Sequence, residues 1–155
     1  MLFELQFLRL VHFDNASFVL DMLLWQVKFY GGFAFLTNLA REIVKDIEDE
    51  EGDAAYNINT LPVQFGTGVA KAVVFAVLAV LLLGLAFFMR GFIAAGAVRE
   101  FAYLAATVVL PILAAVVLLV LAKQKKDYSR ISLLLKVVML MGILSMLAFY
   151  LFNKQ

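Results

Sequence analysis

Long apolar segments alternate with short polar ones over most of the chain. Three of the apolar segments are the most regular: Gly68–Met89, Glu100–Ala122 and Ile131–Phe152. Each is close to the roughly 20 mostly apolar residues that a helix needs to cross a bilayer. A fourth, Ser17–Ala40, contains Asp21 and Lys28. The pattern predicts about four transmembrane helices, with Asp21 at the interface and Lys28 reaching toward water or a polar interior.

Pro111 lies inside one of these segments. Proline removes a backbone donor, but membrane helices tolerate it where neighbouring groups satisfy the freed carbonyl. We therefore expect a kink at Pro111 and no break in the helix.

Composition strengthens the membrane assignment. Of 155 residues, 65% are hydrophobic and 16% are charged, with a mean hydropathy of +0.96, whereas soluble domains are about half apolar and a quarter charged. We expect one all-α integral membrane domain over residues 1–155. A net charge of +1 gives no field that would attract nucleic acid, and the lack of cysteine excludes disulfides and thiolate metal sites.

Basic residues predict the orientation of the bundle. If four helices span, residues 41–67 and 123–130 share one side. That side holds six basic residues, with Lys71 and Lys136 just inside the membrane, and the other side holds Arg9, Arg90, Arg99 and Lys154. By the positive-inside rule the first side faces the cytoplasm of a bacterial or archaeal cell.

That side also contains most of the acidic residues. Seven of twelve fall between Glu42 and Asp53. If this stretch continues the first helix, one polar face within an arc of roughly 140° holds Asn38, Arg41, Glu42, Lys45, Asp46, Asp49 and Asp53. The opposite face is apolar, with Ala40, Ile43, Val44 and Ile47. We expect Gly52 to loosen the last turn, and Glu48, Glu50 and Glu51 to be solvated off this face.

The polar face suits a magnesium diphosphate. Asp49 and Asp53 are one helical turn apart, so their carboxylates repel unless a divalent cation lies between them. Mg²⁺ prefers oxygen ligands and is usually held by one or two carboxylates plus substrate phosphates. Arg41 and Lys45 could neutralise the remaining phosphate charge. The alternative is a solvated acidic segment with no ligand.

The stretch from Ala40 to Asp53, Ala-Arg-Glu-Ile-Val-Lys-Asp-Ile-Glu-Asp-x-x-Gly-Asp, resembles the second aspartate-rich motif of the UbiA prenyltransferase superfamily. Asn59-Thr60-Leu61-Pro62-Val63 resembles the segment that follows that motif. The sequence of this motif most resembles that of the digeranylgeranylglyceryl phosphate synthase-like branch. The predicted helices would be the last four of the family's nine-helix fold.

The resemblance implies transfer of a polyprenyl group, expected to be geranylgeranyl, from its diphosphate to a lipid or aromatic acceptor, expected to be a glycerol-phosphate lipid. Mg²⁺ is the implied cofactor. Asp49 and Asp53 would be catalytic metal ligands and Asp46 a helper ligand, while Arg41 and Lys45 would bind diphosphate. Aromatic residues could line the cavity and stabilise a carbocation: Tyr30, Phe33 and Phe35.

One feature of the family is missing from the sequence. The first aspartate-rich motif, which would face the second across the cavity, has no counterpart before Asn38. We therefore expect this chain to be inactive alone, unless it pairs with a separate N-terminal half or another copy.

Other functions stay open. The chain could be a non-enzymatic membrane protein with a divalent-cation site, or a UbiA enzyme of quinone biosynthesis. A CDP-alcohol phosphotransferase is disfavoured because its Asp-Gly-x-x-Ala-Arg opening is absent. The run from Lys123 to Arg130 is interpreted as an ordinary loop, or as a site for anionic headgroups or a phosphorylated acceptor.

Overall fold

The computed structural model describes residues 16–152, and these form helices and no strand. Arg9 and Lys154, used above for the orientation, lie outside the described residues. The elements in chain order are α2 (Ala16–Ala55), α3 (Leu61–Phe65), α4 (Thr67–Ala94), α5 (Val98–Leu104), the π-helical turn η1 (Ala105–Val109), α6 (Leu110–Leu121) and α7 (Lys125–Phe152). The all-α prediction is confirmed.

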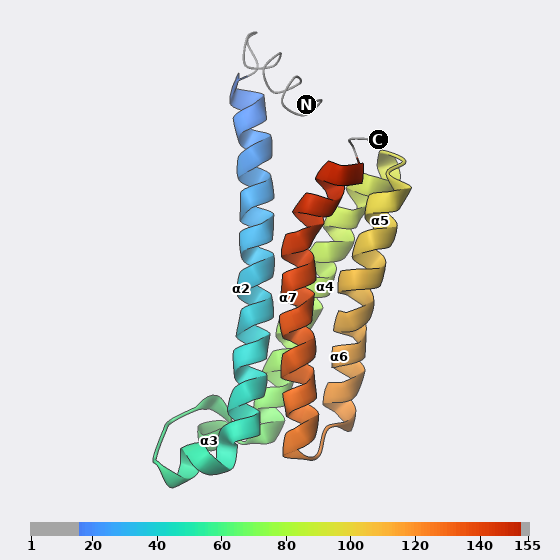
Figure 1. Cartoon of the computed structure of the whole chain (residues 1–155). Helices are drawn as coiled ribbons and strands as arrows, with labels where there is room; N and C mark the ends of the chain where they lie inside the picture. Colours follow the sequence, from blue (N-terminus) through green and yellow to red (C-terminus); the bar gives the residue numbers. More distant parts are fainter. Residues whose placement is uncertain (1–15, 153–155) are drawn as a thin grey trace.

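The long helices form a bundle that runs up and down (Figure 1). α2 packs chiefly on α7 and α4, and α6 packs on α7. The C-terminal end of α2, the short α3, the start of α4 and the junction between α6 and α7 all lie at one end of the bundle (Figure 1). The two polar segments predicted to share a side of the membrane are therefore at the same end.

Three described helical segments are long and apolar enough to cross a membrane: Thr67–Ala94, Val98–Leu121 and Lys125–Phe149. They correspond to the three regular spans expected from the sequence. Only 28% of the most apolar window of each is buried inside the protein, so most of its side chains are left to face lipid. The chain is an integral membrane protein. The crossing predicted for residues 17–40 is not among these three and stays a prediction.

The helix containing Pro111 continues without a break, as predicted. Just before the proline, the chain widens into the π-turn η1, in which the Leu110 N–H donates to the Ala105 carbonyl. The wider turn accommodates the missing donor of the proline and the bulk of its ring. Within the same turn, Thr107 Oγ1 donates a hydrogen bond to the Tyr103 carbonyl at 2.7 Å.

Two tight connections depend on glycine. Gly66 joins α3 to α4 with φ of +84°, and Gly96 turns the chain between α4 and α5 with φ of +66°. Other residues adopt this region of φ only at a cost. Pro62, in the second position of α3, is buried against the neighbouring helices.

Between α6 and α7 the structure differs from the sequence interpretation. Residues 123–130 were expected to form a loop, but α7 already begins at Lys125. Asp127 Oδ2 accepts hydrogen bonds from the backbone N–H groups of Lys123 and Gln124, both at 3.1 Å. This carboxylate satisfies the backbone donors just before the helix, and the helix starts six residues, about 1.7 turns, earlier than expected.

Candidate functional site

The last four turns of α2 carry the polar face predicted from the sequence. Ala40, Ile43, Val44 and Ile47 are buried, whereas Glu42 and Lys45 are exposed. Asp46, Asp49 and Asp53 are partly exposed on the far side from the buried residues. The helical periodicity of this segment is thus confirmed, because every residue assigned to the apolar side packs into the bundle.

Gly52 does not end or interrupt the helix, which runs on to Ala55. The loosening expected there is not observed: α2 continues through Gly52 with three further helical residues, 53–55. Asp53 therefore keeps its place one turn after Asp49, and the spacing needed for a shared cation is retained.

Burial and electrostatic repulsion both act on the carboxylates of this face. The pKa of Asp46 is raised, first by its partial burial and then by the negative charges of Asp53, Glu42 and Asp49; Lys45 offsets part of the increase. A carboxylate surrounded by carboxylates is destabilised in its charged form, and a bound cation would relieve that cost.

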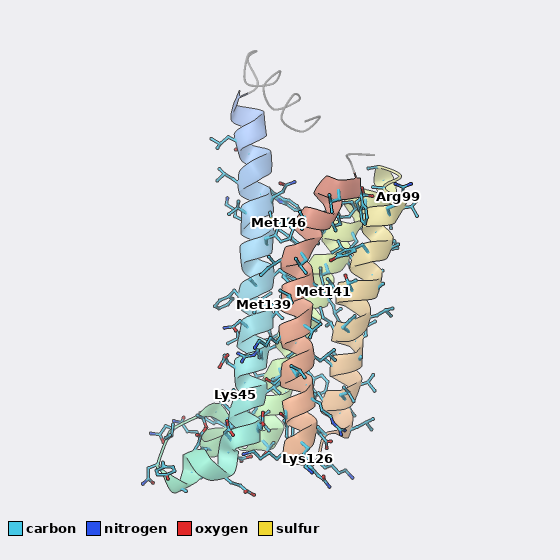
Figure 2. The ribbon with its side chains drawn as sticks, in the orientation of Figure 1. Lys45, Arg99, Lys126, Met139, Met141 and Met146 are labelled. Carbon is cyan, nitrogen blue, oxygen red and sulfur yellow. The ribbon has the colours of Figure 1, made fainter. Side chains whose placement is uncertain are left out.

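The cations of α2 differ in their surroundings. Arg41 donates to the carboxylate of its neighbour Glu42 and is largely covered. Lys45 is exposed, and Figure 2 shows it on the lower part of α2, at the end of the bundle where Lys126 marks the start of α7. Lys45 is adjacent to Asp46 in the sequence, and Arg41 is five residues, about 1.4 turns, before Asp46.

A basic residue that the sequence analysis did not single out joins the face. Lys125 Nζ lies 3.2 Å from Asp49 Oδ1, and the two residues are 76 positions apart. The run 123–130 signalled positive charge on this side, but no local pattern indicates which of its lysines reaches α2.

Glu50 was expected to be solvated, and this was wrong. It accepts a hydrogen bond of 2.8 Å from Thr67 Oγ1, the first residue of α4. The contact fixes the end of α2 to the start of the next span. Glu51 is exposed, as expected.

The donor set fits Mg²⁺ in part. All three aspartates offer hard oxygen ligands, which Mg²⁺ prefers. Among the described residues, no three histidine or acidic side chains converge into a group that could hold a metal ion by themselves. The face therefore fits an ion whose remaining ligands come from a diphosphate and water.

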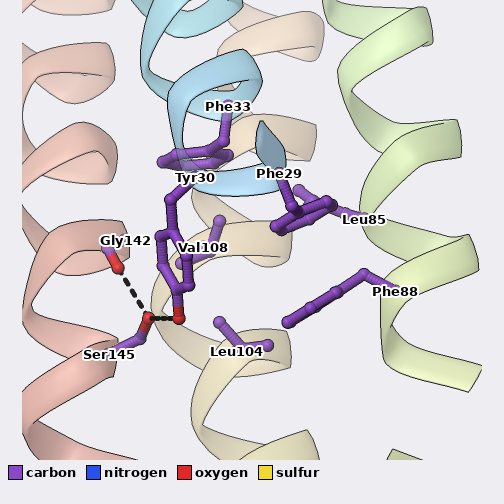
Figure 3. Close-up of a pocket in the computed structure, with 9 residues that line it drawn as sticks. All are labelled: Phe29, Tyr30, Phe33, Leu85, Phe88, Leu104, Val108, Gly142 and Ser145. Atoms are coloured by element: carbon purple, nitrogen blue, oxygen red, sulfur yellow. Dashed lines mark hydrogen bonds between the residues drawn. The ribbon is translucent and has the colours of Figure 1, made fainter. Parts of the chain in front are cut away.

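The three aromatic residues that were expected to stabilise a carbocation lie too far from the aspartates to do so. Figure 3 shows Tyr30 and Phe33 pointing into a small cavity between the helices, with the Tyr30 hydroxyl 3.0 Å from Ser145 Oγ. Phe35 is 66% exposed and does not line this cavity. Phe33 is thirteen residues from Asp46, about 20 Å of helix. Neither ring can therefore touch a carbon bonded to a diphosphate at the aspartates.

A larger apolar groove of about 240 Å³ lies between α2 and α4. Two glycines, Gly32 and Gly84, border it together with Leu36 and Leu81, and Lys28 supplies its charged rim. Leu36 is ten residues before Asp46, about 15 Å along the helix. The groove is therefore on the membrane side of the acidic face.

Several proteins of known function share short stretches with this chain. A digeranylgeranylglyceryl phosphate synthase of Methanopyrus kandleri is 61% identical over 46 residues, 28% of this chain and 17% of the relative. Synthases of the same name are 56% identical over 48 residues in Methanosphaera stadtmanae (31% of this chain, 17% of the relative) and 64% over 33 residues in Thermococcus sibiricus (21% and 12%). Each matched stretch spans less than a fifth of the relative's length.

No solved structure matches the chain. The sequence model of the UbiA prenyltransferase family, however, matches residues 15–144, which make up most of this chain. This chain belongs to the UbiA prenyltransferase family.

Proposed function

We propose that this protein takes part in transfer of a polyprenyl group, geranylgeranyl in the first instance, from its diphosphate to the hydroxyl of a glycerol-phosphate lipid. The observation that carries the proposal is the polar face of α2, where three aspartates follow Arg41 and Lys45 at helical spacing beside an apolar bundle. Binding of a lipid diphosphate needs a charged site for the diphosphate and apolar helices beside it for the prenyl chain. The names of the similar synthases support the acceptor class.

In this proposal Asp49 and Asp53 hold Mg²⁺ and Asp46 assists, while Arg41 and Lys45 bind the diphosphate. Bound Mg²⁺ would stabilise the negative charge that develops on the departing diphosphate. The allylic C–O bond breaks, the acceptor oxygen bonds to the same carbon, and the proton of the acceptor hydroxyl passes to the released diphosphate or to water. The chain's own part is to hold the head group at the membrane surface and to leave the tail in the apolar groove between α2 and α4.

Two further elements belong to the same proposal. The acidic face lies on the cytoplasmic side. The carboxylates that face it come either from a first aspartate-rich motif on a separate N-terminal half or from the acidic face of a second copy of this chain. Because the sequence has no cysteine, orientation can be tested with single cysteines. Glu51→Cys should react with a membrane-impermeant maleimide only in inside-out vesicles, and Arg99→Cys only in right-side-out vesicles; the reverse pattern would overturn the assignment.

The central test is binding of labelled geranylgeranyl diphosphate to the protein in lipid nanodiscs, with and without Mg²⁺. Binding should need Mg²⁺ and should weaken about tenfold or more in Asp49→Asn and Asp53→Asn, since even outer partners of a metal site contribute 10- to 100-fold. Glu51→Gln is the matched control because it removes an exposed charge of the same segment off the polar face. Transfer to a glycerol-phosphate lipid and to an aromatic acceptor is then compared.

The second candidate function is a divalent-cation site without an enzyme. The repulsion that raises the Asp46 pKa would be relieved by any divalent cation, so this reading predicts tight Mg²⁺ binding with no diphosphate. Equal Mg²⁺ affinity with and without the lipid diphosphate would favour it over the prenyltransferase.

A further inference from the structure

An ion pair joins α7 to the acidic face of α2, and its two residues are far apart in the sequence. Lys125 and Asp49 come from helices at opposite ends of the described chain, yet their charged atoms lie 3.2 Å apart. Their side chains are 68% and 44% exposed. An exposed pair of this kind adds little to stability and can exchange partners rapidly. We therefore expect the role of this pair to lie in ligand binding and not in the stability of the fold.

The backbone that carries Lys125 is firmly held. Asp127 caps the turn just before α7. The Ala122 carbonyl, at the end of α6, accepts a 2.7 Å hydrogen bond from Lys71 Nζ and a 3.4 Å bond from the Tyr128 hydroxyl. Ala122 and Tyr128 are both buried. The base of Lys125 thus has a fixed place, while its long side chain is free to move its ammonium group.

A lysine ammonium and a divalent cation compete for the same carboxylate. With no metal bound, Lys125 reduces the repulsion around Asp49. When a metal takes Asp49, the ammonium must leave it, and phosphate oxygens brought by the metal then lie within its reach. Lysine suits such an exchange because it is a point charge with three rotatable donors on a flexible stem.

We propose that Lys125 is a phosphate-binding positioning residue that exchanges Asp49 for a phosphate oxygen of the bound substrate when a divalent cation occupies the acidic face. This rests on the proposed function and adds to it a residue from α7. The phosphate can be that of the prenyl donor or that of a glycerol-phosphate acceptor, since both present the same oxyanion chemistry.

The experiment compares Lys125→Gln with Lys126→Gln in nanodiscs of zwitterionic lipid. Lys126 is the adjacent, exposed lysine at the same end of the bundle (Figure 2), so it controls for the general loss of positive charge. Calorimetry measures three ligands: Mg²⁺ alone, the preformed magnesium–pyrophosphate complex, and glycerol 1-phosphate in the presence of Mg²⁺.

The proposal predicts effects of opposite sign. Lys125→Gln should bind Mg²⁺ alone roughly 1.5- to 5-fold more tightly, because a competing cation is gone, and should bind the phosphate ligand more weakly by a similar factor. Lys125→Arg should keep both affinities, and Lys126→Gln should show neither change. A lysine that only supports the fold would not produce a gain for one ligand and a loss for the other.

The outcomes separate the two proposals. A loss with pyrophosphate assigns Lys125 to the donor, and a loss confined to glycerol phosphate assigns it to the acceptor. Two outcomes would overturn the role of Lys125 and leave the proposed function standing. One is an equal effect of Lys125→Gln and Lys126→Gln; the other is no effect of either while the wild type still binds magnesium pyrophosphate. A wild type that binds magnesium pyrophosphate no better than Mg²⁺ would overturn the proposed function as well.

Discussion

A close contact between α2 and α7, at Phe33 and Gly142, gives a sharp test of the packing. A methyl group built on Gly142 would lie 2.3 Å from Cε1 and 2.7 Å from Cζ of Phe33. Carbon atoms in contact are about 3.5–4.0 Å apart, so the Phe33 ring would have to move by more than about 1 Å. Phe33 is buried, with 5% of its surface exposed, so the ring can move only by shifting into the cavity and the groove that it lines.

Gly142→Ala should therefore destabilise the bundle by about 1–3 kcal/mol, the usual cost of overpacking a core. Unfolding by SDS in bicelles can be followed through Trp25, the only tryptophan, which stacks on Phe29 and Phe88. Because those rings belong to α2 and α4, Trp25 fluorescence reports the separation of α2 from α4 as the bundle unfolds.

Two comparisons make the test decisive. Gly84→Ala places a methyl group where no heavy atom lies within 4 Å, so it should be neutral or stabilising by up to about 1 kcal/mol. Adding Phe33→Leu to Gly142→Ala should recover part of the loss, with a coupling energy of about 0.5–3 kcal/mol. Equal stability of the two alanine variants, or additive effects of the Phe33 and Gly142 changes, would refute the close contact.

Three other changes test the acidic end. Lys71→Met keeps an apolar side chain but removes the closer of the two donors to the Ala122 carbonyl, and should lower the free energy of unfolding by roughly 0.5–1.5 kcal/mol in the SDS assay; wild-type stability would contradict the bond. Asp46→Asn should raise stability at neutral pH by about 0.2–0.5 kcal/mol without metal. Because the folded pKa of Asp46 lies above its unfolded value, the wild type loses stability as the pH rises through that pKa and the variant should not; parallel pH profiles would count against this. Thr67→Val should cost about 0.5–1.5 kcal/mol by removing the bond to Glu50, and no such cost should appear in a Glu50→Ala background, which has already lost the acceptor.

The polar face of α2 could be predicted from the sequence because helical periodicity is a local property. Ala40, Ile43, Val44 and Ile47 recur on one side of the helix, and all four are buried. The continuity of the helix at Pro111 followed from the same kind of reasoning, although the sequence did not indicate that a π-turn would absorb the strain.

What the sequence did not reveal are contacts between distant segments. Lys125 is one of several similar basic residues, and its pairing with Asp49 depends on how α7 packs on α2. The partner of Glu50 and the contact of Phe33 with Gly142 depend on packing in the same way. The early start of α7 was missed because the capping carboxylate, Asp127, follows the residues that it caps. Phe35 was misplaced because all apolar residues of a membrane helix look alike, whether they face lipid or protein.

The continuity of α2 ties the acidic face to the lipid around it. As one helix of 40 residues, α2 is about 60 Å long, roughly twice the thickness of a bilayer's hydrocarbon core. A membrane helix whose apolar stretch does not match the membrane thickness can respond by tilting. If residues 17–40 cross the membrane as predicted, a rigid α2 carries any tilt of that crossing undiminished to its far end. Asp49 and Asp53 would then swing relative to Lys125, which is fixed on α7. The affinity for magnesium and diphosphate should therefore depend on the acyl-chain length of the host membrane, which would make bilayer thickness a control on the chemistry at its surface.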